Sequence, residues 1–438
     1  MPTVRRAIDQ TFANVAALPE LTYRLAVRPA AGLIFIFVYV LHWLLVQLVA
    51  HFFPRVSPWP LSTTTSTSAD QASSRVAALP EMWALIAKHS GVVGAWRLMG
   101  VCLASRKGSQ KWLRSLPGLV LCGGACDGGR KRDGEFISEV WRLDLSNLQW
   151  SRMADLARGR ERAASCTVRG RVVVLGGFVA GRVRRAVGTA SVEIMGYNSE
   201  AGEYRVTTLP PLTCGSVFNP VVIAIDDSAS DLGQVLLIAR GEEHGASPAL
   251  VHKVDLASGI CTPQPCPRIL PEDEMCMGCM AARLVDGRIV YVRSGNNSQK
   301  TTAQVWEPPA PGSLHEASWR WRALPWMSLR RCHASGLVLS DGRFAVFGGA
   351  CNLNSGTVEG TFDALSLDSH DARWEQLPPM LQARHGFACE AIGGCVLVAG
   401  GTISQTVAVY EEALGRWRTL PGKLPYDNEV YWMSSALM

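Results

Sequence analysis

One element recurs along the chain: a short run of apolar residues, many of them β-branched, that ends in glycine. In the copy at residues 373–417 this run is one of four short apolar runs separated by turn residues, which predicts a four-stranded antiparallel sheet. One such sheet cannot bury both of its faces alone, so the copies must pack against each other. Successive copies are 53, 64, 54, 54 and 52 residues apart, measured between Gly124, Gly177, Gly241, Gly295, Gly349 and Gly401.

A period of about 50 residues with four strands per copy resembles the kelch-repeat family, over Leu119 to the C-terminus. The resemblance implies an all-β fold, a six-bladed kelch-type β-propeller over 115–438. Two copies depart from the paired glycine, at Arg240-Gly241 and Ser294-Gly295. Glycine permits a sharp turn beside the next blade, and tryptophan fills the gap between sheets. The expected structural residues are Gly123, Gly124, Gly176, Gly177, Gly348, Gly349, Gly400, Gly401, Trp150, Trp321, Trp374 and Trp417.

The first copy begins at what would be the second strand of a blade, so its first strand must come from elsewhere. Aligning Trp417 on Trp374 places Glu429–Leu437 where another copy would begin. We predict that this C-terminal segment pairs beside Leu119–Cys122 and closes the ring. A closed ring has no open sheet edge that could pair with another molecule.

The segment 78–114 predicts two helices joined by a glycine-containing turn, and it resembles a shortened F-box. Leu79-Pro80, Leu85-Ile86, Arg97-Leu98, Val101-Cys102 and Trp112 follow the order of the family pattern, with Leu103 where the family usually has Arg. An F-box before kelch repeats is a known domain order, which supports this interpretation by analogy. The alternative is a helical cap packed on the propeller. The resemblance implies that a ubiquitin-ligase adaptor contacts Leu79, Pro80, Leu85, Ile86 and Val101.

Residues 33–53 form a run of 21 residues without a formal charge. As a helix, this run is long enough to cross about 30 Å of hydrocarbon. We therefore predict a single N-terminal transmembrane helix over 31–53, between a tail at 1–30 and a Ser/Thr/Pro-rich linker at 54–77, and a protein anchored in a membrane. A buried helix is the alternative interpretation.

The side of the membrane stays open. The basic residues Arg5, Arg6, Arg24 and Arg28 precede the run, and Arg55 alone follows it closely. This bias favours a cytosolic N-terminus and a luminal propeller. An F-box, in contrast, requires the propeller in the cytosol or nucleus. An Arg-rich, acid-poor N-terminus is also typical of an organelle transit sequence.

Cysteine spacing suggests a possible metal knuckle. Cys276 and Cys279 are separated by two residues, and Cys261 and Cys266 lie upstream. Zinc, a disulfide and plain packing all remain open for these four cysteines.

A recurring arginine precedes the first strand of several copies. Arg384-His385 and Arg331-Cys332-His333 stand at the same place in two copies, and Arg162 comes near it in a third. We expect these arginines to be structural donors to loop carbonyls rather than catalytic groups.

The net charge of +6 is not gathered into an aromatic-interleaved basic stripe, so nucleic-acid binding has little support. No catalytic triad, carboxylate pair or phosphate-binding loop stands out. We therefore predict a non-enzymatic protein-binding adaptor without a cofactor, whose propeller loops bind a protein partner. The longest such loops are expected at Ala125–Ser138, Ala180–Ala190, Gly241–Ala249 and Ala350–Thr361.

With a working F-box, this adaptor would be the substrate receptor of a cullin-type ubiquitin ligase. The first alternative is a membrane-tethered kelch scaffold without ubiquitin chemistry. A remote alternative is a galactose-oxidase-like copper oxidase, for which no set of Tyr, His and Cys ligands can be assigned.

Overall fold

The computed structural model describes residues 79–126, 136–181, 186–225, 231–241, 249–267, 276–295, 301–307, 319–327, 329, 331–352, 357–358, 361–367, 372–402 and 404–438. The predicted tail, transmembrane helix and linker, 1–77, lie outside these residues. Within the described ranges, no helix combines the length and the apolar character needed to cross a membrane.

In the part of the chain that the structure describes, two helical elements precede the sheets: α5 (Pro80–Leu98) and α6 (Leu103–Ser115). The predicted glycine turn lies inside α5, where Gly91 has φ +70° and breaks the helix in two. A side chain at Gly91 would also lie only 2.8 Å from the Gly393 carbonyl oxygen. The two helices predicted within 78–114 correspond to the two halves of α5, and α6 was not predicted because its sequence contains few apolar residues. It packs through small residues instead: a Cβ at Gly108 would lie 2.2 Å from the Pro80 carbonyl oxygen.

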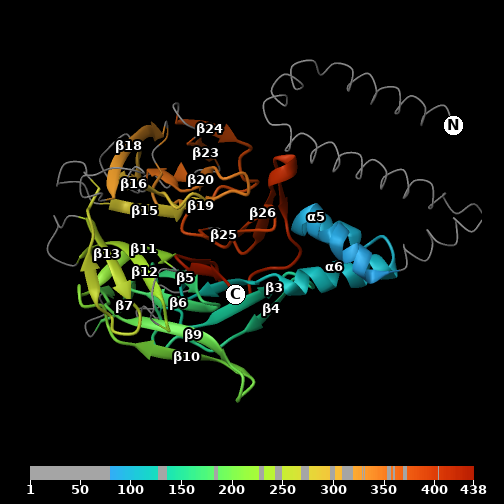
Figure 1. Ribbon diagram of the computed structural model, residues 1–438, viewed down its shortest axis with the longest axis horizontal. Coiled ribbons are helices and arrows are strands. Elements are labelled where there is room, and N and C mark those ends of the chain that lie inside the picture. Colours follow the sequence, from blue (N-terminus) through green and yellow to red (C-terminus); the bar gives the residue numbers. More distant parts are fainter. Residues whose placement is uncertain are drawn as a thin grey trace, which may run out of the picture. The chain divides into compact units, whose positions relative to one another are not determined.

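Six four-stranded antiparallel sheets follow, each with its strands in simple meander order from the innermost strand outward (Figure 1). Blade 1 contains β30 (Ser434–Leu437), β1 (Leu119–Cys122), β3 (Val140–Asp144) and β4 (Gln149–Arg152). Blade 2 contains β5 (Ala164–Val168), β6 (Arg171–Leu175), β9 (Val192–Asn198) and β10 (Glu203–Leu209). Blade 3 contains β11 (Val217–Ile225), β12 (Gln234–Gly241), β13 (Ala249–Asp255) and β14 (Cys261–Pro263).

The second half of the chain repeats the pattern. Blade 4 contains β15 (Cys276–Arg283), β16 (Ile289–Gly295), β17 (Thr301–Glu307) and β18 (Arg320–Met327). Blade 5 contains β19 (Ser335–Val338), β20 (Phe344–Phe347), β23 (Phe362–Ser366) and β24 (Arg373–Leu377). Blade 6 contains β25 (Ala388–Ile392), β26 (Cys395–Ala399), β27 (Val407–Glu411), the 3₁₀ turn η1 (Glu412–Leu414) and β28 (Arg416–Thr419).

Three two-stranded ribbons extend from the blades. They are β2 (Ala125–Cys126) with β29 (Val430–Tyr431), β7 (Phe178–Ala180) with β8 (Ala186–Gly188), and β21 (Ala350–Asn352) with β22 (Thr357–Val358). The innermost strands contact one another in a closed cycle of β5, β11, β15, β19, β25, β30 and again β5. The fold is therefore the six-bladed β-propeller that the repeat predicts.

The ring closes through the C-terminus, in the register that pairs Leu119 with Leu437 and Cys122 with Ser434. Backbone hydrogen bonds between Gly118 and Met438 run in both directions, at 2.7 and 3.0 Å. The predicted pairing of the last strand beside Leu119–Cys122 is thus present, and blade 1 is built from both ends of the chain.

The paired glycines and the tryptophans lie at the joints between neighbouring strands and blades. Both glycines of each of the four pairs have positive φ. At Gly177, a Cβ would lie 2.5 Å from the Glu161 carbonyl oxygen, so the close approach also requires glycine. Three of the tryptophans donate their indole N–H to a carbonyl at or just after the end of the previous blade's outermost strand: Trp321 to Pro265, Trp374 to Pro325 of β18, and Trp417 to Pro378, at 2.7–2.8 Å. Trp150 packs against the cluster between blades 1 and 6.

Candidate functional site

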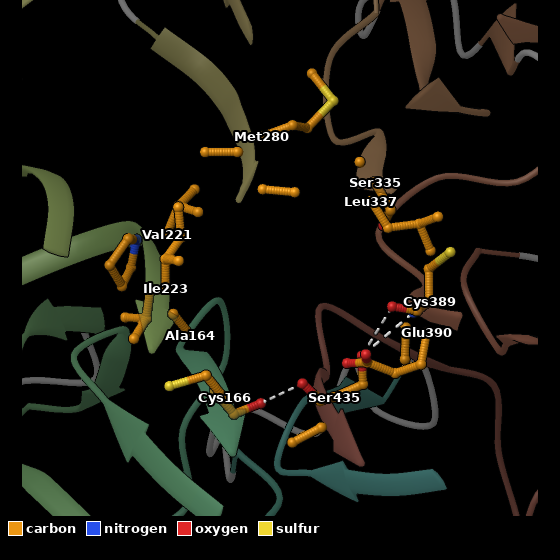
Figure 2. A pocket seen from close by; sticks show the side chains of 18 of the residues that line it. Ala164, Cys166, Val221, Ile223, Met280, Ser335, Leu337, Cys389, Glu390 and Ser435 are labelled. Atoms are coloured by element: carbon orange, nitrogen blue, oxygen red, sulfur yellow. Dashed lines mark hydrogen bonds between the residues drawn. The ribbon is translucent and has the colours of Figure 1, made fainter. Parts of the chain in front are cut away.

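A channel of about 470 Å³ runs between the six innermost strands, and each strand contributes side chains to its wall. Figure 2 shows Cys166, Cys389, Glu390 and Ser435 together on the wall formed by β5, β25 and β30. Val221, Ile223, Met280 and Leu337 make other parts of the wall apolar, and the lining also includes Ser335 on β19 and Arg283 on β15. The channel thus has a mixed lining, with a group of polar side chains around Glu390.

Glu390 is the one carboxylate among the residues that line this channel. Its burial among apolar side chains raises its pKa from 4.5 to about 7, against a hydrogen bond with Ser435 that lowers it. Burial, and secondarily the charge of Glu390, also raise the pKa values of the Cys166 and Cys389 thiols. Thiols with raised pKa values are poor nucleophiles at neutral pH. The channel can therefore hold a polar group near Glu390. The raised pKa values of Cys166 and Cys389 disfavour nucleophilic chemistry by these thiols.

The raised pKa of Glu390 predicts a loss of stability as pH rises. The folded state retains a proton that the unfolded chain releases above pH 4.5, so stability is greatest below that value and falls as pH approaches about 7. We expect the free energy of unfolding to fall by about 1–3 kcal/mol over this range, since water in the channel moderates the full effect. In Glu390→Gln this fall should disappear, whereas the exposed Glu200→Gln should keep it. Urea unfolding at pH 5 and pH 7.5 measures the difference, and an equal fall in Glu390→Gln would contradict the assignment.

Four residues with left-handed backbone conformation meet at the end of the channel where the innermost strands begin. Arg162, His333, Gly386 and Trp432 each have φ between +51° and +63° and each stand two residues before an innermost strand. Their backbones are linked in series: Arg162 donates to Trp432, Trp432 to Gly386, and Gly386 to His333, at 2.6–3.0 Å. This series joins blades 2, 1, 6 and 5 at one mouth of the channel.

The side chains at this mouth are basic and aromatic. The Arg162 guanidinium lies over the Trp432 ring at 3.6 Å from its centroid, and the His333 ring lies 5.9 Å from the same ring and 6.1 Å from His385. Burial lowers the pKa of His333 to about 3 and lowers that of His385, and the charge of Arg162 adds to both shifts. Both histidines are therefore neutral at physiological pH. Because the guanidinium would also repel a copper ion, this mouth gives the copper-oxidase alternative no support.

The recurring arginine is placed as expected in two blades and corrected in the third. Arg331 donates to the Gly348 and Thr361 carbonyls, and Arg384 donates to the Gly400 and Thr406 carbonyls. In blade 2 the equivalent residue is Arg160, which donates to the Gly176 and Ser191 carbonyls. The repeat pattern predicts Arg162 for this role, which is wrong. Arg162 lies two residues after Arg160, and its side chain lies at the channel mouth instead.

The side chain of Cys276 lies outside the described residues, so the predicted knuckle can be followed only at Cys261, Cys266 and Cys279, and the structure places these three in different surroundings. Cys266 is exposed, and Cys279 contacts the Tyr291 hydroxyl at 3.1 Å in the channel wall. Cys261 lies instead with Cys214 and His252, in blade 3. One sequence feature could have indicated this group: Cys261 occupies the position that tryptophan holds in other blades. Parts of the four predicted display loops lie outside the described residues.

Of the five F-box-like residues, Pro80, Leu85 and Ile86 lie on α5, Leu79 immediately precedes it, and Val101 lies in the turn between α5 and α6. Leu79, Leu85 and Val101 are exposed, and Pro80 and Ile86 are partly buried. The predicted adaptor contact is therefore accessible, but it contributes nothing to the channel or its mouth.

No protein-family model matches this chain, and neither does any curated protein. Solved structures do resemble it, among them one described as the structure of YjhT. That likeness has a TM-score of 0.49 and 11% sequence identity, and it covers 70% of this chain and 98% of the other. A likeness at this level carries no argument about function. The propeller is established by the strand pairing described above.

Proposed function

We propose that this protein is a protein-binding adaptor whose helical elements dock the adaptor subunit of a cullin-type ubiquitin ligase and whose propeller holds the substrate. The observation that carries the proposal is an outward apolar face on helices that are fixed to the propeller by their other face. A propeller fold is consistent with a protein-binding scaffold, and the helical face supplies the second contact that a substrate receptor needs.

The inner face of the helices is attached to blades 6 and 1. Trp96 donates its indole N–H to the Leu145 carbonyl at 2.7 Å, and Arg97 forms an ion pair with Glu411. The Val92 amide donates to the Gly393 carbonyl at 3.1 Å. Five apolar side chains of the helices share one buried cluster with these blades: Ala87, Val92, Val93, Ala95 and Leu113. A ligand held by the helices would therefore be held at a fixed position relative to the propeller.

The outer face is apolar and exposed. Leu79, Met82, Leu85 and Ile86 are spaced so that they form one stripe along the first half of α5. Leu85 is 54% exposed, and Leu103, at the start of α6, is 67% exposed. Of the thirteen exposed large apolar residues in the described chain, five lie between 79 and 103. Scattered exposed apolar residues are ordinary, whereas a gathered set marks an interaction site.

Leu85→Asp should strongly weaken binding of the ligase adaptor while leaving the propeller folded. Truncating or charging a residue at the centre of an interface typically costs about 2 kcal/mol or more, so we expect affinity to fall at least about 30-fold. Binding of the purified ligase adaptor to the full chain, measured by calorimetry, tests this. Leu381→Asp is the matched control, because Leu381 is 65% exposed but lies between blades 5 and 6. Wild-type chain that fails to bind the adaptor, or equal binding by Leu85→Asp, would refute the ligase role.

The membrane-tethered scaffold is the second candidate, favoured by the uncharged run at 33–53. It shares the protein-binding propeller but places it on a membrane. Protease digestion of sealed membranes separates the two candidates: a protected propeller is luminal and incompatible with a ubiquitin ligase, and a digested one is compatible with both.

A further inference from the structure

Blade 3 differs from its neighbours where the outermost strand meets the segment entering from the previous blade. In blades 4 and 6 a tryptophan on the outermost strand donates to a carbonyl of that segment, and in blade 5 Trp374 donates to Pro325 near the end of β18. In the strand register, Trp417 pairs with Tyr410 of its blade, and Cys261 pairs with the equivalent Val254. A small thiol therefore stands where the other blades have an indole.

The entering segment of blade 3 brings a second thiol to the same place. The Thr213 amide donates to the Gly259 carbonyl at 3.0 Å, and the Cys261 amide donates to the Thr213 hydroxyl at 2.9 Å. These bonds hold the following residue, Cys214, against the outermost strand. The ligand atoms of Cys214, Cys261 and His252, which is on β13, all lie within 4.8 Å of one another.

His252 supplies an independent indication of a missing partner. Its Nδ1 atom is buried and makes no hydrogen bond. A buried imidazole nitrogen without a partner loses its hydration without compensation. A metal ion bound by the imidazole would remove this cost.

We propose that Cys214, His252 and Cys261 bind a Zn²⁺ ion that fastens the segment entering blade 3 to its outermost strand. Two thiolates and one imidazole are ligands that Zn²⁺ prefers. Ligand atoms on a tetrahedral zinc lie roughly 3.3–3.8 Å apart, so side-chain shifts of about 1 Å would complete the site. The fourth position is left to water or to an external ligand. The ion would join the same two segments that the indole–carbonyl bond joins in blades 4 and 6.

Zinc analysis of the full chain, purified with its predicted membrane segment in detergent, tests the proposal. We expect about one Zn²⁺ per chain by mass spectrometry of the metal. Cys214→Ser and Cys261→Ser should each lose it, and the exposed Cys266→Ser should retain it. Since a serine variant could lose metal by unfolding, His252→Cys and His252→Ala form a second pair. The cysteine variant should keep zinc, because it offers a third thiolate, and the alanine variant should lose it.

Cobalt substitution and the thiol mass give two further readouts. Co²⁺ bound in the wild type should show a thiolate-to-cobalt absorption band that weakens in Cys214→Ser. The proposal is overturned if the wild type, grown with zinc, carries none above background. It is also overturned if the zinc survives in both serine variants, or if peptide mass analysis shows that Cys214 and Cys261 are joined by a disulfide.

Discussion

Replacing Arg331 with Met should destabilise the propeller by about 3–5 kcal/mol, because the substitution leaves a buried carboxylate without its partner. Arg331 is fully buried between blades, where it pairs with Asp363 and donates to the Gly348 and Thr361 carbonyls. Removing the guanidinium therefore leaves three acceptors in a site that water does not reach. Urea unfolding of the wild type and of Arg331→Met measures the loss.

Blade 6 provides a matched comparison for this effect. Arg384 occupies the equivalent position and donates to the Gly400 and Thr406 carbonyls, but Ala408 stands where blade 5 has Asp363. Among the described residues, no carboxylate pairs with it, and burial alone lowers its pKa to about 10. Arg384→Met should thus cost less, about 1–3 kcal/mol, since all the acceptors that lose a donor, including the Thr406 hydroxyl and the Gln382 amide oxygen, are neutral.

A double substitution separates the pair from the packing. Arg331→Met with Asp363→Leu removes both charges, and it should recover part of the stability that Arg331→Met loses. If Arg331→Met costs no more than Arg384→Met, the ion pair with Asp363 is not what stabilises this joint. If the double variant is less stable than Arg331→Met, the carboxylate has another favourable partner.

The sequence predicts the propeller well because each repeat contains residue types, glycine and tryptophan, that few other residues can replace at those positions. Paired glycines are required where φ is positive and a Cβ would collide, as at Gly177. The tryptophans recur because a large ring with one donor fits between an outer strand and a carbonyl of the entering segment. Both signals depend on local backbone geometry, so they are visible along a single chain. The closure by Ser434–Leu437 follows from counting strands in the same repeat.

The channel mouth could not be predicted in the same way. Arg162 and Trp432 adopt positive φ although their residue types do not favour it, so the sequence does not mark their turns. Arg160 and Arg162 are two residues apart, and only the packing decides which one faces the buried carbonyls. Such assignments depend on contacts between blades that lie far apart in sequence.

The cluster in blade 3 has the same origin. Cys214, His252 and Cys261 come from three separate segments. The spacing of Cys276 and Cys279 predicts a metal knuckle at another place in the chain. Spacing rules find metal sites built within one loop, whereas this cluster is assembled by strand pairing and by the segment that crosses between blades.

Deleting Ser434–Met438 should have the largest effect of all, because blade 1 then loses its innermost strand. The deletion removes the pairing of β30 with β1 and leaves β1 as an open edge. It also removes the carbonyls of Ser435 and Leu437, which accept from the Ser165 and Thr167 hydroxyls of blade 2. We expect a loss of at least about 5 kcal/mol, comparable to the whole stability of many domains. The truncated chain should be protease-sensitive and lack a cooperative unfolding transition.

Adding the C-terminal strand as a separate peptide distinguishes the loss of its pairing with β1 from a general failure to fold. A synthetic peptide of residues 429–438 should bind the truncated chain by strand addition and restore protease resistance. The same peptide with Ala436→Asp is the matched control, because Ala436 is 2% exposed and a carboxylate there would be buried without a partner. In the full chain, Ala436→Asp should be strongly destabilising, while Thr419→Asp on the exposed outer strand of blade 6 should change stability little. A truncated chain that unfolds at the same urea concentration as the wild type would show that the ring holds without its C-terminal strand.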